Sequence, residues 1–203
     1  MPAHVGLVTL VTLYDFVKRV RPRKVRELAG SREAEVLRTA SEGELRAIAL
    51  AYGALPSLTL RMLTVEDVCS GGGGWTFASG EDFAVACTLR VRAYYSTTED
   101  MDAVLEDILT EGDTPGSRIV FSHDNEPLVT PDSGRLYGRG QTVAWDLPAC
   151  PVEEVAARTR ACDPPLYRCL CEGDHATVAD IRNAHGRVVR LGLHAVRYFR
   201  VDR

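Results

Sequence analysis

The side chains best suited to metal chemistry gather near the C-terminal end of the sequence. They are three thiols and two imidazoles, namely Cys162, Cys169, Cys171, His175 and His185. Thiolate sulfur and imidazole nitrogen are the ligands that zinc prefers, and a hairpin can bring residues of both strands and their turn together. The C-x-C-x3-H spacing differs from standard zinc motifs. The cluster therefore predicts either a zinc site or structural thiols, and its irregular spacing favours the thiols.

A second candidate is a dense basic run in the N-terminal part of the chain. Its six cationic residues fall within nine positions: Lys18, Arg19, Arg21, Arg23, Lys24 and Arg26. Such density can bind phosphates or act as a nuclear import signal. The other interpretation is a solvated boundary between helix and loop, whose charges stabilise the C-terminal end of a first helix. We favour the solvated boundary and keep a nucleic-acid-binding function through residues 18–26 as an alternative.

Cys69 is the candidate nucleophile of a further, enzymatic alternative. His123 and Asp124 could supply the base and the orienting acid that a nucleophilic thiol requires. No family-type signature surrounds Cys69, and the run Gly71–Gly74 is not followed by the lysine of a P-loop. Acidic residues over 99–113 lack the ligand order of an EF-hand and indicate a solvated face. A cysteine- or zinc-dependent enzyme therefore stays an alternative to a protein with packed thiols.

The elements that must position these residues begin with helices. Apolar residues at helical spacing predict helices over 5–20, 23–40 and 41–52, with a break in the second near Gly30-Ser31. Ser41 opens an S-x-x-E capping box, which is typical of a helix N-terminus. Two helices that meet at Ser41 could form a helix-turn-helix, but the glutamates around them would repel DNA phosphates.

From Ser57 onward apolar residues recur at every second position, as in a sheet with one buried face. The clearest strand is Phe83–Ala93, which puts Cys87 in the core. Ser96 and Glu99 predict a second capping box before an acidic helix, and Pro151 is expected to start a short helix. Further strands are expected over 58–63, 118–122, 141–147, 166–171, 177–182 and 187–200.

Charge and cysteine usage limit the classes of function. The formal net charge is −4 and the isoelectric point is about 5.8, which argues against general attraction to nucleic acid. The apolar segment Val5–Val17 contains Asp15 and is too short to span a bilayer. With no export signal, we expect an intracellular protein, cytoplasmic or nuclear, whose six cysteines are thiols or metal ligands rather than disulfides.

Lysine is nearly absent, since Lys18 and Lys24 are the only two among 24 Lys and Arg residues. Asparagine and isoleucine are also scarce, whereas alanine, glycine and arginine are abundant. Codons rich in G and C produce this bias whatever the fold. Together with the six cysteines, it favours a eukaryotic or viral source.

These observations predict an α+β protein in which a helical portion, residues 1–56, packs on a mostly antiparallel sheet formed by residues 57–203. One continuous core is expected for a chain of this length. The basic run, the acidic helix and four aromatic residues expected at the surface are features of contact surfaces. The aromatic residues are Tyr94, Tyr95, Tyr198 and Phe199. We therefore expect a non-enzymatic protein-interaction module, a viral accessory or structural protein that binds a host or viral protein, with self-association as an alternative.

Overall fold

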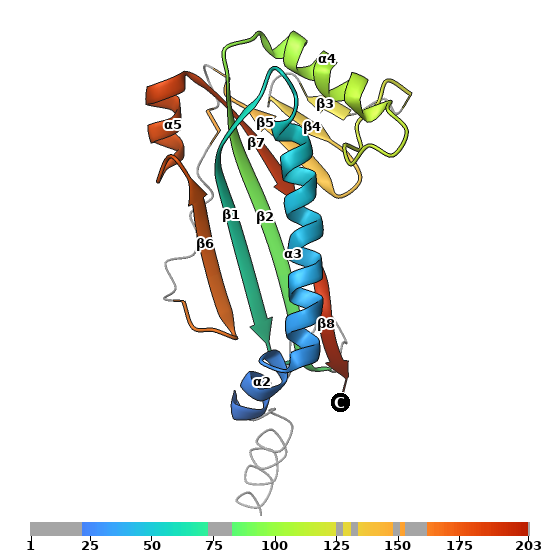
Figure 1. Ribbon diagram of the computed structural model, residues 1–203, viewed down its shortest axis with the longest axis vertical. Coiled ribbons are helices and arrows are strands. Elements are labelled where there is room, and N and C mark those ends of the chain that lie inside the picture. The colour runs from blue at the N-terminus through green and yellow to red at the C-terminus, as the bar shows by residue number, and fades with distance from the viewer. Residues whose placement is uncertain are drawn as a thin grey trace, which may run out of the picture.

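A computed structural model describes residues 22–72, 83–124, 128–130, 134–147, 151–152 and 162–202. It confirms the α+β class (Figure 1). The helices of this described part are α2 (Pro22–Ala29), α3 (Arg32–Gly53), α4 (Met101–Gly112) and α5 (Val178–His185). The strands are β1 (Thr59–Ser70), β2 (Phe83–Thr97), β3 (Leu128–Thr130), β4 (Arg135–Tyr137), β5 (Gln141–Trp145), β6 (Tyr167–Gly173), β7 (Arg187–Leu193) and β8 (Val196–Asp202).

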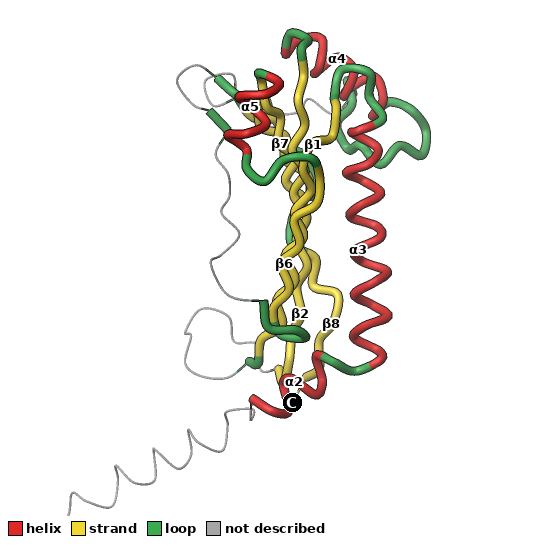
Figure 2. The backbone as a smooth tube through the Cα atoms, turned by 60° about the vertical axis from the view of Figure 1, so that its left-hand side comes forward, coloured by secondary structure: helices red, strands yellow, loops and turns green. Residues whose placement is uncertain are grey.

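The described strands form one antiparallel sheet with the order β3-β4-β5-β7-β2-β1-β6. The long strand β2 is its centre, because β1 pairs along one side while β7 and then β8 pair along the other. Figure 2 shows α3 on one face of the sheet and α5 on the opposite face. The larger hydrophobic cluster lies on the α3 face, and a smaller cluster lies under α5.

Helix α3 is one continuous helix, so the predicted helix start at Ser41 is wrong. The N-cap is Ser31, whose extended backbone and side chain fit that role: its hydroxyl accepts a hydrogen bond from the Ala34 N–H at 3.2 Å. The break predicted near Gly30-Ser31 is thereby confirmed. No proline follows Ser41 within α3, and one S-x-x-E pattern does not interrupt a helix that packing holds together. The helix-turn-helix interpretation is wrong for the same reason, because the two helices expected to meet at Ser41 are one helix.

Strand alternation follows the sequence pattern in β1 and β2. Val85, Cys87, Leu89 and Val91 are buried on the α3 face, whereas Arg90 on the other face is exposed. This outcome confirms the core position predicted for Cys87. The alternation works because a sheet covered by a helix on one face requires apolar side chains at every second residue.

Two predicted elements have a different structure. Residues 177–182 begin helix α5 rather than a strand, because Thr177 and Asp180 form a capping box that satisfies each other's backbone N–H. Residues 118–122 form no regular strand, and the Arg118 carbonyl accepts from the Gln141 side chain instead of a ladder partner. Ser96 lies at the end of β2, and the N-cap of α4 is Asp100.

The four aromatic residues expected at the surface are buried, so that prediction is wrong. The hydroxyls of Tyr95 and Tyr198 find partners inside the protein, as buried tyrosines usually do. Tyr95 Oη donates to the Ala49 carbonyl at 2.8 Å, and Tyr52 Oη donates to Gln141 Oε1 at 2.7 Å. These two bonds join α3 to the sheet and fix which side of the helix faces outward.

Candidate protein-binding face on helix α3

Helix α3 has 22 residues but buries only a narrow inner side against the sheet. Its buried residues are Ala34, Leu45, Ala49 and Tyr52. With 100° between successive residues, these positions lie on one side of the helix. The helix therefore leaves the side opposite these residues to solvent or to a partner.

The outward side of α3 carries an uncharged stripe, which we call the outer stripe. Its residues are Val36, Ala40, Gly43, Ala47 and Leu50. Their separations alternate between four and three residues, so they form one line along the helix. Val36 is 59% exposed and Leu50 is 60% exposed, although both side chains are large and apolar. A contiguous exposed apolar strip is a feature of protein interaction sites.

The middle of the outer stripe is made of small residues. A Cβ atom added at Gly43 would meet no atom of the described residues within 4 Å. Glycine inside a helix costs roughly 0.5–1 kcal/mol relative to alanine. Gly43 therefore weakens α3 without relieving a contact inside the described part of the chain. The absence of a side chain at Gly43 leaves open space on the outer surface of the helix.

One flank of the outer stripe is fixed by ion pairs to β6. Arg46 donates from both Nη atoms to the Glu172 carboxylate at 2.7 Å and from Nε to Glu42 at 2.8 Å. Arg168 also binds Glu42. Burial raises the pKa of Glu42, but the hydrogen bonds from Arg168 and Arg46 outweigh it and hold that pKa below its usual value. The network aligns α3 with the sheet edge.

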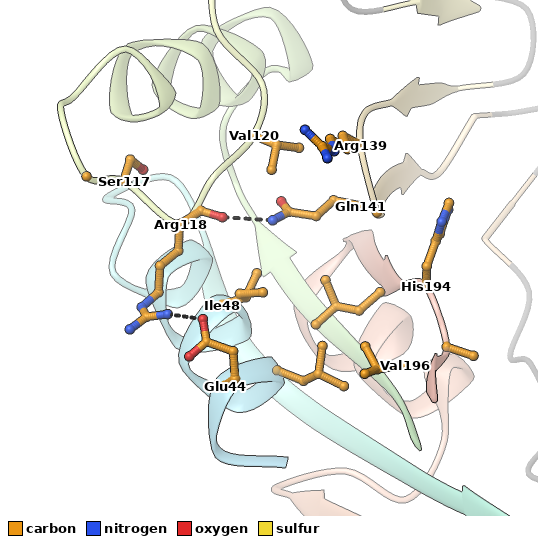
Figure 3. Close-up of a pocket in the computed structure, with 14 residues that line it drawn as sticks. Glu44, Ile48, Ser117, Arg118, Val120, Arg139, Gln141, His194 and Val196 are labelled. Atoms are coloured by element: carbon orange, nitrogen blue, oxygen red, sulfur yellow. Dashed lines mark hydrogen bonds and ion pairs between the residues drawn. The ribbon is translucent and has the colours of Figure 1, made fainter. Parts of the chain in front are cut away.

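The other flank of α3 borders a hollow of about 600 Å³. The hollow lies at the junction between β7 and β8. Residues 193–195 face only two residues of β2, so the strand pairing along this side of β2 is interrupted there. Arg118 Nη1 donates to Glu44 Oε1 at 2.5 Å, and the Gln141 side-chain amide donates to the Arg118 carbonyl at 2.7 Å (Figure 3). These polar groups satisfy one another, and Ile48 adds apolar surface to the same hollow.

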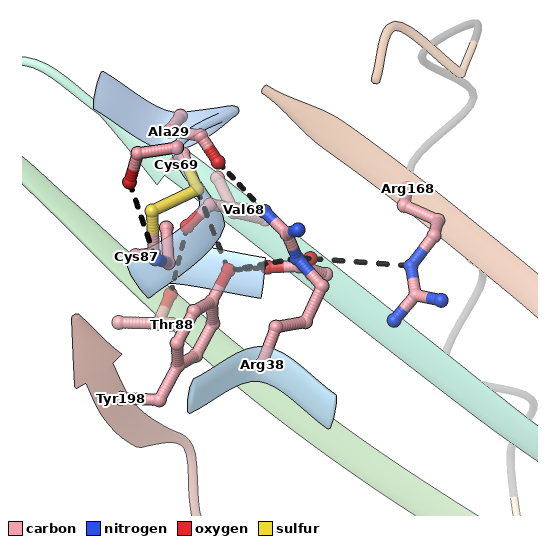
Figure 4. The surroundings of a disulfide bond; sticks show 11 residues. Ala29, Arg38, Val68, Cys69, Cys87, Thr88, Arg168 and Tyr198 are labelled. Atoms are coloured by element: carbon pink, nitrogen blue, oxygen red, sulfur yellow. Dashed lines mark hydrogen bonds and ion pairs between the residues drawn. A yellow bond between two sulfur atoms is a disulfide. The ribbon is translucent and has the colours of Figure 1, made fainter. Parts of the chain in front are cut away.

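Cys69 and Cys87 form a disulfide between opposite residues of β1 and β2 (Figure 4). The expectation that all cysteines are thiols or metal ligands is therefore wrong for this pair. A disulfide sulfur is no thiolate, so Cys69 in this form lacks the reactive group of the proposed nucleophile. His123 bonds instead to Asp113 at 2.5 Å and approaches Glu106 at 3.4 Å. The hydrogen bond to Asp113, followed by that to Glu106, raises the pKa of His123.

A buried charged cluster lies beside the disulfide. Asp67 on β1 accepts from Arg38 Nε at 2.6 Å and from Tyr198 Oη at 2.9 Å. Arg38 also donates to the Ala29 carbonyl, and Tyr198 Oη lies 3.6 Å from Cys69 Sγ (Figure 4). Burial, and then the neighbouring Asp67 charge, raise the pKa of Tyr198. The cluster joins α2, α3, β1 and β8, which is a structural role.

The predicted metal ligands separate into two groups. His175 Nε2 lies 2.9 Å from His185 Nε2, whereas Cys162 Sγ is 3.6 Å from the Cys169 carbonyl. Cys171 is exposed on β6. Within the described residues no three His, Cys, Asp or Glu side chains lie close enough to hold a metal ion.

The basic run is only partly described, since Lys18, Arg19 and Arg21 lie outside the described residues. Arg26 donates to both carboxylate oxygens of Asp163, at 2.6 and 2.7 Å, and to the Pro164 carbonyl. Arg23 pairs with Glu27 one helical turn away. Arg26 thus joins α2 to the segment before β6, as a structural charge does.

The chain matches no family model, no curated protein and no solved structure. Among the helices of the described ranges, none is long and apolar enough to cross a membrane.

The outer stripe is the site that sequence reasoning missed. Its signal was present in the four-three spacing from Val36 to Leu50. The capping box at Ser41 predicted a new helix there, so Val36 and Leu50 were placed on two different helices and their common spacing was not recognised.

Proposed function

We propose that this chain is a non-enzymatic protein-interaction module that binds an α-helix of another protein through the outer stripe of α3. The exposed, uncharged stripe with a glycine at its centre is the observation that carries the proposal. Fixed charges on the β6 flank border the outer stripe on one side, and the hollow lined by polar and apolar side chains borders it on the other.

The chemistry of the stripe favours a helical partner over an extended one. Alternating four and three separations match the spacing at which helices pack side by side. The 15 residues from Val36 to Leu50 cover about 21 Å of helix axis, roughly four turns. Small residues at Ala40, Gly43 and Ala47 let a partner helix come close, while Val36 and Leu50 supply apolar ends. The partner helix should therefore present large apolar side chains at the same spacing.

The source and compartment belong to the same proposal. Composition supports a genome with G+C-rich codons, and a viral accessory or structural protein with a host or viral partner is consistent with it. The predicted location is intracellular, cytoplasmic or nuclear. The Cys69–Cys87 disulfide favours instead a place where thiols are oxidised. The binding face is unaffected by this choice, because it carries no cysteine.

Photo-crosslinking in the source cells tests the proposal. A photoreactive residue is placed at Glu33 or Thr39, which border the outer stripe on its two sides and are exposed. The matched control is Ala103, an exposed position on α4. We expect both stripe positions, but not Ala103, to crosslink to one helical segment of another protein, with linked residues three or four apart.

Other crosslinking results would contradict the partner helix. Crosslinks to residues 1–21 of the same chain would show that the chain covers its own stripe. Crosslinks to α3 of a second copy would show self-association. Equal crosslinking from Ala103 would show contact without a defined face.

A further inference from the structure

Two imidazoles from separate elements meet on the side of the sheet that carries α5. His175 lies in the turn after β6, and His185 is the last residue of α5. Their Nε2 atoms are 2.9 Å apart, and the rings stand edge to face with centroids 5.0 Å apart. In the metal-free protein one Nε2 donates its proton and the other accepts it, so each nitrogen uses the other as its polar partner.

Backbone geometry fixes His175 in this position. Gly173 has φ +131°, and a Cβ there would lie 2.1 Å from the Arg61 carbonyl oxygen, so the turn requires glycine. The next residue, Asp174, donates its N–H to the same carbonyl at 3.1 Å. The turn is thus attached to β1 immediately before His175.

Helix α5 fixes His185 from the other side. Thr177 and Asp180 cap its start, and Val178 and Ile181 are buried against the sheet. The last turn of a helix presents carbonyl groups and the negative end of the helix dipole, which favour a cation. Asp174 adds a carboxylate next to His175; its side chain is 78% exposed and lies 4.0 Å from Arg61 Nη1.

We propose that His175 and His185 bind a divalent transition-metal ion, of which Zn²⁺ is the reference, through their two Nε2 atoms. Zinc binds imidazole nitrogen at about 2.0–2.1 Å, and tetrahedral geometry puts two such nitrogens about 3.4 Å apart. The observed pair therefore needs to open by only about 0.5 Å, which small ring rotations provide. On binding, the donor imidazole changes tautomer: its Nε2 proton is given to water and Nδ1 takes one up, so both histidines bind as neutral imidazoles.

The proposed site contains only two of the five metal ligands predicted from the sequence. Cys162, Cys169 and Cys171 are not part of it, since they form no group of three ligands with the histidines in the described residues. Two protein nitrogens leave coordination positions for water or for a ligand from another molecule. We therefore expect weaker, more exchangeable binding than in a closed structural zinc site.

Calorimetric titration of the full chain with ZnCl₂ tests the site. The wild type should bind one ion at this pair, and His175→Gln and His185→Gln should each weaken binding at least tenfold. His194→Gln, at the interruption between β7 and β8, is the matched control and should bind like the wild type. A triple Cys162→Ser, Cys169→Ser, Cys171→Ser variant should also keep the site.

Electron paramagnetic resonance with Cu²⁺ gives a second reading that does not depend on stability. The wild-type spectrum should show nitrogen couplings from two imidazoles, and each histidine variant should lose one. Zinc binding unchanged in both histidine variants, binding lost only in the cysteine variant, or a Cu²⁺ spectrum without nitrogen couplings would overturn the proposal.

Discussion

Asp67 occupies a position on the α3 face of the sheet where its neighbours Val65 and Cys69 are apolar core residues. Its side chain is 2% exposed. A carboxylate at this depth is tolerated because Arg38 and Tyr198 satisfy it. The buried pair specifies the position and rotation of α3 relative to β1, since another rotation of the helix would move Arg38 away from Asp67.

Removing one partner should therefore cost more than removing both. We expect Arg38→Leu to lower the free energy of unfolding by about 3 kcal/mol, because the buried Asp67 carboxylate then keeps only the Tyr198 hydroxyl and the longer contact to Arg168 Nε at 3.9 Å. The double variant Arg38→Leu/Asp67→Leu should recover much of that loss. Urea unfolding of the two variants and the wild type measures the difference.

Arg23→Leu is the control, because the Arg23–Glu27 pair is exposed and should contribute at most about 1 kcal/mol. A double variant no more stable than Arg38→Leu would contradict the interpretation of a costly buried charge.

At the same scale, the core position of Cys87 could be predicted from alternation, but its bond to Cys69 could not. The bond depends on register: Cys69 of β1 stands opposite Cys87 of β2, and no local pattern gives that pairing. The surface position assigned to Tyr95 and Tyr198 fails for a related reason. Tyrosine hydroxyls are polar in a sequence, but the fold supplies buried partners such as Asp67 for Tyr198.

At the scale of elements, Asp146 joins three segments just after β5. Its carboxylate accepts from Arg182 of α5 at 2.8 and 3.0 Å, from the Val152 N–H at 2.7 Å and from the Val188 N–H at 2.9 Å. Burial raises the pKa of Asp146, but the hydrogen bonds from Arg182 and the two backbone N–H groups outweigh it and lower that pKa below 3.8.

This link should make stability depend on pH in a defined direction. Since the folded pKa is depressed, the stabilisation is present above the unfolded value near 3.8 and is lost as pH falls through the folded pKa. Asp146→Asn should lower the free energy of unfolding at pH 7 by about 1–3 kcal/mol. The difference from the wild type should shrink in strongly acidic solution.

Urea unfolding at several pH values measures this dependence, with the exposed Asp124→Asn as the control. A difference between wild type and Asp146→Asn that stays constant down to strongly acidic pH would contradict the assignment.

The sequence predicted helices and strands well where apolar residues recurred at one regular spacing and no capping or turn signal contradicted it, as in β2. It failed where a short polar signal competed with packing. Ser41 carried a capping box inside α3, whereas Thr177 carried a real one at the start of α5. The two cannot be distinguished locally, because the structure around each decides whether the chain is already helical when it reaches the box.

At the scale of the whole molecule, the sheet is covered unequally. α5 packs on one face over the smaller cluster, and α3 packs on the other with its inner side alone. Helix α3 lies beside the sheet, roughly parallel to the long strands (Figure 2), and the outer stripe is on its exposed side. An elongated protein with one such line along its length is well suited to bind a helix side by side.

A substitution of Gly43 tests the proposed binding face most directly. A larger side chain there should stabilise the helix of the isolated chain but obstruct the partner helix in the complex. The measurement is the affinity of the partner segment found by crosslinking for Gly43→Gln, taken together with the free energy of unfolding. Ala103→Gln is the control, since it adds the same side chain at an exposed position of α4.

We predict that Gly43→Gln binds the partner at least tenfold more weakly, whereas its free energy of unfolding stays the same or rises by up to about 1 kcal/mol, because glycine disfavours a helix interior. Ala103→Gln should bind like the wild type. Unchanged affinity of Gly43→Gln, or a loss of affinity matched by a loss of stability, would contradict a binding face on α3.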